Sequence, residues 1–296
     1  MGWLTINDFL SRLLIAFLIN CIGSFLAWKR GYLSTDGAVA AFIVGAMIFL
    51  LMLIAWFLLL LFFVSSSILS KVKRESSPTK AKAQEMFEKS EKRDARQVLA
   101  NSFVGMLFLL LVLPEGGNPN LLSAPVVAYV GAIAAVTADT WATEIGTISA
   151  KEPRWVLNPR QRVPVGTSGG ISLLGTLAAF FGALSLVIAF LVCLTIQIEL
   201  TGSSLPSTEK ILIILGVTTM AGLVGSFADS FLGATVQAFY FCPSCHIGTE
   251  KQVHTKCGGT KTTLTRGYSV VNNDLVNLLA AAAAGFFAYV AFVLVG

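Results

Sequence analysis

The chain has 296 residues, of which 55% are apolar and only 12% are charged. A soluble domain carries roughly 25% charged residues, so this composition excludes an ordinary soluble fold. The net charge of +5 does not indicate a nucleic-acid-binding protein, because the basic residues gather in a few loops, where they report membrane orientation. We predict an all-α, polytopic helical membrane protein that forms a single integral membrane domain over residues 1–296.

Apolar runs of about 20 residues, the length that crosses a bilayer, define the expected helices. About eight transmembrane helices are expected, at residues 8–28, 36–50, 51–69, 97–113, 120–138, 168–195, 210–229 and 274–295. The second and third share one apolar run, Gly37 to Ser70, which is too long for one helix and short for two. A tight hairpin and a short half-helix followed by a full helix both fit this run, and a single span is the alternative.

Basic loops give the expected orientation, because Lys and Arg concentrate in cytoplasmic loops. Residues 71–96 hold nine Lys or Arg, and residues 148–166 and 238–273 hold four each. Residues 114–119 and 197–209 hold none. With eight spans the two sets of loops alternate without exception. This alternation favours two helices in the long apolar run and places both termini outside the cytosol.

One expected cytosolic loop, 71–96, is long, charged and mostly compatible with a helix after Pro78. It is interpreted either as a solvated amphipathic linker or as a helix that lies on anionic lipid headgroups. Both interpretations place this segment outside the apolar interior of the bilayer.

A weak internal repeat relates two of the expected helices. Residues 131–146 and 221–236 superpose at an offset of 90, which aligns Asp139 with Asp229, each preceded by an alanine. Both aspartates close a Gly/Ala-rich apolar helix on the same side of the membrane. Such paired segments are typical of two structural halves that meet at one site, and a chance match of small residues is the alternative.

Asp139 and Asp229 are the most informative residues, because an aspartate costs about 2.5–3.5 kcal/mol at a membrane helix centre on insertion scales. Such carboxylates usually face a bundle interior, a cavity or a partner. We predict that both bind Mg²⁺ that bridges phosphates, since hard cations prefer carboxylate oxygens. The alternative is pairing with a loop Lys or Arg, or helix capping. Glu144 points elsewhere if the helix continues past Asp139, and a turn after Thr143 would bring it into the same site.

A glycine-rich segment opens the helix expected at 168–195. Its residues Thr167, Ser168, Gly169 and Gly170 combine hydroxyl groups with a backbone that a ligand can approach closely. Free N–H groups and the helix dipole favour an anion at such a position, so the segment is a candidate phosphate site. It is not a Walker A loop, because the Gly-Lys-Ser/Thr core is absent. A plain helix N-cap is the alternative.

Other polar residues gather at the same ends of the expected helices. Arg160 and Arg162 lie in the loop before the glycine-rich segment, and Asn273 and Asp274 open the last helix. Asn101 lies near the start of the fourth helix. Each alone is typical of a cap or an interhelical hydrogen bond. Their joint position at the cytosolic face indicates an active site there, since a transport path needs polar residues through the bilayer midplane.

The loop at 242–259 gathers Cys242, Cys245, His254 and Cys257. Cys242-x2-Cys245 resembles a zinc knuckle, and His254-x2-Cys257 takes the place of a second one. The four side chains are therefore a candidate Cys₃His site for structural Zn²⁺. Free thiols are one alternative. A redox role is another, although a thioredoxin-like C-x2-C expects a βαβ context that the sequence lacks.

Four motifs of the chain read ADTWATEIGT, GTSGGISLLGTLAA, GSFADSFLGATVQ and NNDLVNLL. With them the chain resembles the integral membrane family that contains the phytyl-phosphate kinase of vitamin E (tocopherol) biosynthesis. The resemblance runs from about residue 20 to the end. The four motifs together are specific to the family and much less specific to one substrate. The family is distantly similar to the CTP-dependent phytol and dolichol kinases.

The resemblance implies an isoprenoid-phosphate kinase, which transfers a phosphoryl group from a nucleotide, CTP or ATP, to phytyl or polyprenyl monophosphate and gives the diphosphate. The implied residues are Asp139 and Asp229 for Mg²⁺, the segment 167–170 for a phosphate, Arg160 and Arg162 for charge neutralisation, and Asn273 and Asp274 for the remaining shell. Asn101 and Glu144 are further candidates for binding the substrate.

The expected partners are an isoprenoid lipid phosphate, the nucleotide and membrane lipid, with no nucleic acid. The expected location is a bacterial or cyanobacterial cell membrane, a thylakoid membrane or an organellar membrane. Two alternatives remain for the activity. One is a transporter or flippase for a phosphorylated lipid, and the other is a related CTP-dependent lipid kinase or cytidylyltransferase.

Overall fold

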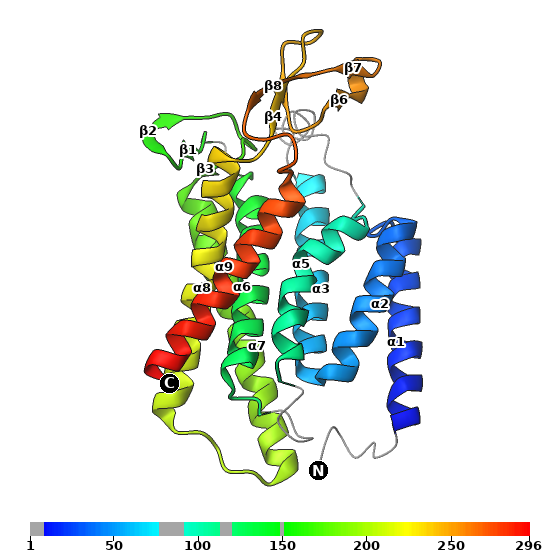
Figure 1. Cartoon of the computed structure of the whole chain (residues 1–296), viewed down its shortest axis with the longest axis vertical. Coiled ribbons are helices and arrows are strands. Elements are labelled where there is room, and N and C mark those ends of the chain that lie inside the picture. The colour runs from blue at the N-terminus through cyan, green and yellow to red at the C-terminus, as the bar shows by residue number, and fades with distance from the viewer. Residues whose placement is uncertain (1–8, 77–91, 113–119, 149–150) are drawn as a thin grey trace.

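The computed structural model describes residues 9–76, 92–112, 120–148 and 151–296. Within these ranges the chain forms eight α-helices that run alternately up and down through one bundle (Figure 1). Their bounds are α1 Phe9–Lys29, α2 Thr35–Leu51, α3 Leu53–Ser76, α5 Ala95–Leu110, α6 Ala124–Gly146, α7 Leu173–Thr201, α8 Thr208–Thr235 and α9 Asn273–Val295. The prediction of about eight helices is confirmed. α1 begins and α9 ends at the same end of the bundle, as an even number of crossings requires (Figure 1).

Six of the described helices are long and apolar enough to cross a membrane: α1, α3, α6, α7, α8 and α9. α2 and α5 are apolar but shorter, with 17 and 16 residues, or about 25 Å at 1.5 Å per residue. The chain is therefore a multi-pass integral membrane protein, as its composition predicts.

The long apolar run divides into two helices at Met52. This residue, between α2 and α3, has an extended backbone with φ −161° and ψ 117°. Its N–H donates to the Ile48 carbonyl, and its own carbonyl accepts from the Trp56 N–H. The Met52 N–H and carbonyl therefore both keep a hydrogen-bond partner in a neighbouring helix, and the turn leaves neither of these backbone groups unpaired. The expectation of two helices in this run is confirmed, and α2, with 17 residues, is the shorter of the two.

α6 is the centre of the bundle. It packs against α3, α5, α7, α8 and α9, and every residue from Val126 to Ala138 is buried. A helix that is apolar on all sides belongs in the core of a bundle. The polar residues of α6 begin only at Thr137 and Asp139, near the end of the bundle that carries the strands.

Glycine and alanine allow the central helices to approach closely. A Cβ atom on Gly225 of α8 would lie 2.3 Å from the Cβ of Ala135 in α6. On Gly131 of α6 it would lie 2.6 Å from the Cβ of Ala288 in α9. Small residues drive helix packing in membranes, because lipid and leucine are equally apolar and close contact is what favours association.

Large apolar side chains cover the outer faces of the bundle. On α9, for example, Phe286, Val293 and Leu294 are exposed. A soluble protein rarely presents contiguous apolar surface of this kind. In a membrane protein the same surface faces lipid.

Two segments at one end of the bundle carry short strands that the sequence did not indicate (Figure 1). Between α6 and α7 lies an antiparallel sheet of order β2-β1-β3, with β1 Arg154–Trp155, β2 Asn158–Arg162 and β3 Gly170–Ile171. Between α8 and α9 lie the sheets β5-β4-β8 and β6-β7, with β4 Phe239–Phe241, β5 Gly248–Thr249, β6 Val253–His254, β7 Thr260–Lys261 and β8 Thr263–Arg266. Most of these strands are shorter than the 4–8 residues over which alternation identifies a strand.

Several helix boundaries differ from the prediction, and three of them bear on the polar residues at this end of the bundle. α6 and α8 end at Gly146 and Thr235 instead of 138 and 229. Hydropathy falls at each aspartate, but the polar residues that follow still form helix. α7 begins at Leu173 instead of 168, because the Ser172 hydroxyl caps it by accepting from the Gly175 N–H at 3.1 Å. The glycine-rich segment therefore precedes the helix and does not open it.

The charged segment 71–96 is described only at its two ends. α3 continues to Ser76, and Asp94 caps α5 by accepting from the Gln97 N–H at 3.0 Å. Residues 77–91 lie outside the described residues, so both interpretations of this segment stay predictions.

Candidate functional site

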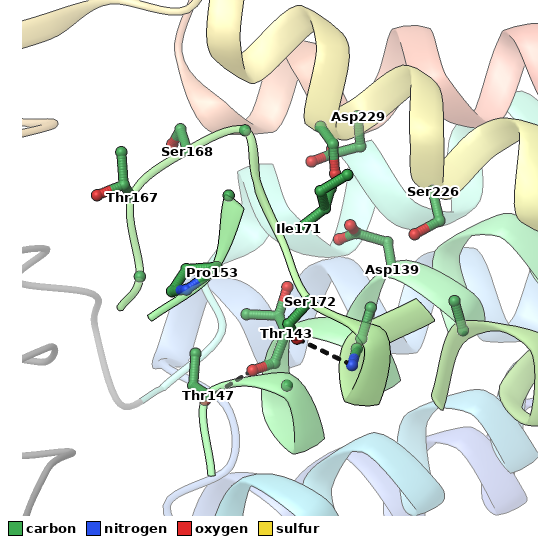
Figure 2. A pocket seen from close by; sticks show the side chains of 18 of the residues that line it. Asp139, Thr143, Thr147, Pro153, Thr167, Ser168, Ile171, Ser172, Ser226 and Asp229 are labelled. Atoms are coloured by element: carbon green, nitrogen blue, oxygen red, sulfur yellow. Dashed lines mark hydrogen bonds between the residues drawn. The ribbon is translucent and has the colours of Figure 1, made fainter. Parts of the chain in front are cut away.

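A polar pocket lies at the strand-bearing end of the bundle, between α6, α7, α8 and the start of α9 (Figure 2). Its volume is about 130 Å³, room for roughly four water molecules at about 30 Å³ each. The lining includes two acids from the helices, several hydroxyl groups, the loop at 165–170 and Glu250 from the segment between β5 and β6. Such a pocket suits a small, charged, hydrated group.

Asp139 and Asp229 reach this pocket from neighbouring helices. Asp139 lies on α6 with Thr143 one turn later, and Asp229 lies on α8 with Ser226 one turn earlier; all four line the pocket (Figure 2). Residues three or four apart share a helix face, so each helix presents one carboxylate and one hydroxyl. The pocket therefore has the oxygen-rich lining that hard cations prefer.

The two aspartates occupy equivalent places on α6 and α8. Asp139 lies seven residues before the end of α6, and Asp229 lies six before the end of α8, or roughly 10 Å along each axis. Four residues before each aspartate come Ala135 and Gly225, which lie so close together that a Cβ atom on Gly225 would clash with that of Ala135. The small side chains thus bring the two carboxylate-bearing faces together. The internal repeat stays a prediction, although this symmetry is what it requires.

The helix termini around the pocket carry opposite partial charges. α6 and α8 end there, and their C-termini are the negative ends of the helix dipoles. α7 and α9 begin there, with Ser172 and Asn273 in the lining, and helix N-termini favour anions. A cation near the aspartates and an anion near the α7 and α9 termini are both favoured, which is the arrangement that a metal–phosphate pair needs.

The glycine-rich loop closes one side of the pocket and lies against the end of α8. Gly169 has φ +87°, and a Cβ atom there would lie 2.5 Å from the Cβ of Ala234. The Gly170 N–H donates to the Thr167 carbonyl at 2.9 Å, which forms a tight turn. Only glycine fits position 169, because both the left-handed backbone and the contact with Ala234 exclude a side chain.

Glu250 is a pocket residue that sequence reasoning missed. It accepts a short hydrogen bond from the Ser168 hydroxyl. Arg266 lies nearby and donates a hydrogen bond to the Gly233 carbonyl at 3.1 Å. Its guanidinium also lies over the ring of Phe239. Burial lowers the pKa of the Arg266 guanidinium, and the attraction of Glu250 acts against that shift. The signal available in the sequence was an acid in the Cys/His loop, but nothing indicated that this loop reaches the glycine-rich segment.

The pocket brings together only part of the predicted site. Its lining contains Asp139, Asp229, Thr167, Ser168, Gly169, Gly170 and Asn273. Five other candidates lie outside that lining: Asn101, Glu144, Arg160, Arg162 and Asp274. Asp274 occupies the first turn of α9, where an acid is favourable in itself.

Arg160 and Arg162 lie on β2, all of whose residues are exposed. They do not line the pocket, and among its described lining residues none is Lys or Arg. The expectation that they face the site rested on their nearness in sequence to the glycine-rich segment. The β2-β1-β3 sheet carries them away from it.

Glu144 points to a different place, because α6 continues through it without a turn. Its Oε1 accepts from the Ser70 hydroxyl of α3 at 2.8 Å. Nearby, Arg93 donates to the Ser66 hydroxyl at 2.9 Å. Burial lowers the pKa of Arg93 to about 10, and the attraction of Glu144 opposes that shift. Glu144 therefore stabilises a cation between α3, α5 and α6.

Replacing Glu144 with Gln is expected to lower the free energy of unfolding by about 1–3 kcal/mol, because a buried cation loses its compensating charge. Activity below the unfolding transition should be unchanged. Thermal unfolding in detergent measures this, with the exposed Glu199→Gln in α7 as a neutral control. Lost activity at unchanged stability would instead return Glu144 to the site.

Asn101 lies in the wall of a second cavity, between α1, α2, α3 and α5. Its volume is about 450 Å³, and its lining is mostly apolar, with Arg30 and Arg93 among the few charged residues. This cavity shares no lining residue with the polar pocket. Asn101 is thus not brought together with the aspartates.

The four residues of the candidate zinc site form a separate group outside the polar pocket. Cys242, Cys245, His254 and Cys257 place their ligand atoms within 4.8 Å of one another.

Comparison with known proteins gives a consistent assignment. A family model described as Integral membrane protein DUF92 matches residues 18–285. Protein PGR of Arabidopsis thaliana is 28% identical over 277 residues, which cover 90% of this chain and 92% of that protein. Uncharacterized membrane protein MJ0933 of Methanocaldococcus jannaschii is 31% identical over 226 residues, covering 76% of this chain and 83% of that protein. No solved structure matches the chain.

The matched residues include all four motifs on which the family resemblance was based. That resemblance is confirmed, and the chain belongs to the DUF92 family of integral membrane proteins.

Proposed function

We propose that the protein transfers a phosphoryl group from a nucleoside triphosphate, CTP or ATP, to an isoprenoid monophosphate of the phytyl or polyprenyl class. The observation that carries the proposal is the polar pocket itself, which Asp139 and Asp229 line together with the glycine-rich loop. The confirmed family resemblance supports the same reaction class.

The donor set fits Mg²⁺. Two carboxylates and nearby hydroxyl groups are hard oxygen ligands, and Mg²⁺ commonly takes one or two carboxylates together with phosphate oxygens and water. Asp139 and Asp229 would hold the ion. When bound, Mg²⁺ would supply positive charge that neutralises phosphate oxygens.

The reaction makes few demands on the protein beyond position and charge. An oxygen of the lipid monophosphate forms a bond to the γ-phosphorus, the bond from that phosphorus to the β-phosphate oxygen breaks, and the nucleoside diphosphate leaves. A phosphate monoester is already ionised near neutral pH, so no general base is required. Catalysis of this kind is positioning and electrostatic stabilisation.

The chain's own residues would orient the two substrates. Thr167 and Ser168 offer hydroxyl donors, and the backbone at Gly169 and Gly170 allows close approach of a phosphate. Ser168 is engaged by Glu250, so a bound phosphate would take over that hydroxyl. Because Arg160 and Arg162 lie outside the described pocket lining, the N-termini of α7 and α9 would supply positive potential there.

The lipid tail has a route out of the pocket into the bilayer. Phe227 lines the pocket and is 44% exposed on the outer face of α8. A headgroup in the pocket would therefore continue past Phe227 into the surrounding lipid. This opening explains why such an enzyme is built within the membrane.

The described helices favour an enzyme over a transporter or flippase. Below the aspartates, α6 is buried and almost wholly apolar from Val126 to Ala138. Thr137 on α6 and Thr218 on α8 donate to carbonyls of their own helices. A path for a phosphorylated lipid needs polar groups across the midplane, and the described core of this bundle presents few.

The test is phosphoryl transfer by the purified full chain in detergent with Mg²⁺. CTP and ATP, each labelled at the γ-phosphate, are supplied separately with phytyl, geranylgeranyl and farnesyl monophosphates. A labelled diphosphate supports the proposal and identifies the donor. Release of pyrophosphate with transfer of a nucleotidyl group would indicate the cytidylyltransferase alternative. No product from folded protein, with movement of a lipid phosphate across vesicles, would favour the flippase.

A further inference from the structure

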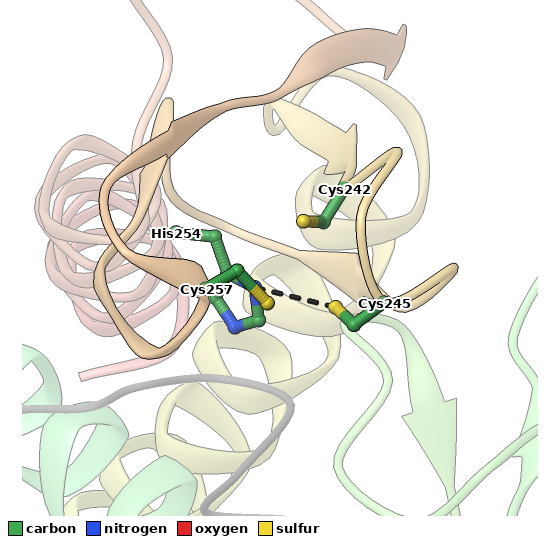
Figure 3. A group of neighbouring side chains, drawn as sticks. All are labelled: Cys242, Cys245, His254 and Cys257. Carbon is green, nitrogen blue, oxygen red and sulfur yellow. Dashed lines mark hydrogen bonds between the residues drawn. The ribbon is translucent and has the colours of Figure 1, made fainter.

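Outside the pocket, the richest group of reactive side chains is the Cys/His loop at 242–259. Its two halves are built alike. Cys242 and Cys245 lie in the turn between β4 and β5, whereas His254 ends β6 and Cys257 lies in the turn between β6 and β7. Each antiparallel hairpin therefore supplies two of the four side chains (Figure 3).

The distances fit a tetrahedral metal site. The three sulfurs and one imidazole nitrogen all lie within 4.8 Å of one another, and Cys245 Sγ is 3.4 Å from His254 Nδ1. Tetrahedral zinc with bonds of about 2.3 Å to sulfur and 2.0–2.1 Å to nitrogen holds its ligand atoms roughly 3.5–3.8 Å apart. Figure 3 shows the sulfurs and the ring turned toward a common centre. Only a small contraction separates these positions from a closed site.

The turns are shaped so that the ligands converge. The residue after Cys245, His246, has φ +56°, and the residue after Cys257, Gly258, has φ +68°. Few residues other than glycine adopt this left-handed backbone, so its presence at His246 marks a turn imposed by its surroundings. The same backbone feature follows a cysteine in both halves of the loop.

Burial and chemistry favour a structural ion. Cys242 and His254 are only 0% and 3% exposed. Three thiolates and an imidazole are a closed set of four soft and borderline ligands, the Cys₃His type that holds structural zinc. A disulfide would use two of the three sulfurs and leave the third beside it without a role.

The small sheets that carry these residues need such a link. Their strands have two to four residues, and segments of this size seldom form a sufficient apolar core without a metal or disulfides. A metal ion that joins two hairpins contributes folding free energy directly.

We propose that Cys242, Cys245, His254 and Cys257 bind one structural Zn²⁺, which holds the segment between the two hairpins over the polar pocket. That segment, 250–252, connects β5 to β6 and carries Glu250, the partner of Ser168. Because both hairpins are fixed by the same ion, the position of Glu250 depends on it. The zinc site thus sets one wall of the pocket without touching what binds there.

Elemental analysis of the full chain, purified in detergent without added metal, tests the site. About one zinc per chain is expected. Cys257→Ser and His254→Ala should each lose most of it, whereas His246→Asn, in the same loop and compatible with φ +56°, should keep it. Zinc that is absent from the wild type, or present equally in all four proteins, overturns the proposal, as does iron at the same stoichiometry.

A second measurement covers variants that fail to fold. Wild-type protein is titrated with a mercurial thiol reagent, and released zinc is followed with a chromogenic chelator. The chain has five free cysteines, two of which, Cys21 and Cys193, lie outside the loop. Release of one zinc as the three loop thiols react supports the site, and reaction of all five thiols without release of zinc refutes it. Hydrogen exchange at 167–170 should be faster in the zinc-free protein, and unchanged exchange would refute the link to the pocket. Neither readout depends on phosphoryl transfer, so failure of the proposed function would leave this test intact.

Discussion

Asp139→Asn and Asp229→Asn are each expected to abolish measurable phosphoryl transfer, with a loss of at least about 100-fold. Outer-shell partners of a metal typically contribute 10–100-fold, and these carboxylates are proposed as direct ligands. Asparagine keeps the size of the side chain, so the bundle should fold normally. Initial rates at saturating nucleotide and lipid phosphate, across a range of Mg²⁺ concentrations, measure the effect.

Glu209→Gln is the matched control, because it also removes one negative charge from α8 but lies at the opposite, exposed end of the helix. Its rate should equal that of the wild type. If Asp139→Asn retained full activity at low Mg²⁺, the assignment of metal ligands would be wrong. If only one aspartate mattered, the metal would be held by a single carboxylate, and the symmetry of α6 and α8 would be incidental to the chemistry.

Gly225→Val is expected to cause a large loss of stability. Even the first carbon of the new side chain would lie 2.3 Å from the Cβ of Ala135 and 3.0 Å from that of Ala284. Overpacking of a tight core costs about 1–3 kcal/mol and more when backbones must separate. A fall of several degrees in the unfolding temperature in detergent follows from roughly 2–4 °C per kcal/mol.

Gly216→Ala provides the comparison within the same helix. A Cβ atom at Gly216 has nothing within 4 Å, and alanine is the better helix former by about 1 kcal/mol. This variant should be as stable as the wild type or slightly more so. Equal destabilisation by both substitutions would mean that the loss at Gly225 reflects helix composition and not contact with α6.

Separation of α6 and α8 should also weaken the site one turn above. Gly225→Val protein that remains folded at low temperature should show reduced affinity for Mg²⁺, because the two aspartates would lie farther apart.

The membrane helices were predictable because each is a long, continuous run of apolar residues in the sequence. Runs of apolar residues gave the eight helices, and the charge of the loops resolved the run that divides at Met52. The ends of α6 and α8 were placed too early, since hydropathy reports where apolar residues stop and not where backbone hydrogen bonding stops. The same rule hid the approach of Thr143 to the pocket.

The candidate site was only partly predictable from the sequence. Asp139 and Asp229 were identified because charged residues are unusual in apolar helices. The glycine-rich segment was identified because hydroxyl groups and an open backbone suit a phosphate. Glu144 lies close to Asp139 in the sequence, yet the direction of its side chain depends on whether α6 continues for the five residues between them. Glu250 could not be assigned, because its position depends on a fold of two-residue strands with no periodic signal.

The central place of α6 has a consequence for how the protein is made. Among the six helices that are long and apolar enough to cross a membrane, α6 is the least apolar, and three of the helices packed around it, α7, α8 and α9, follow it in the chain. During synthesis α6 therefore enters the bilayer before most of its neighbours exist, with Asp139 and Glu144 still facing lipid or the insertion machinery. The helix that forms the core of the finished bundle is therefore exposed during insertion. It becomes fully buried only when α9, the last helix, has been inserted.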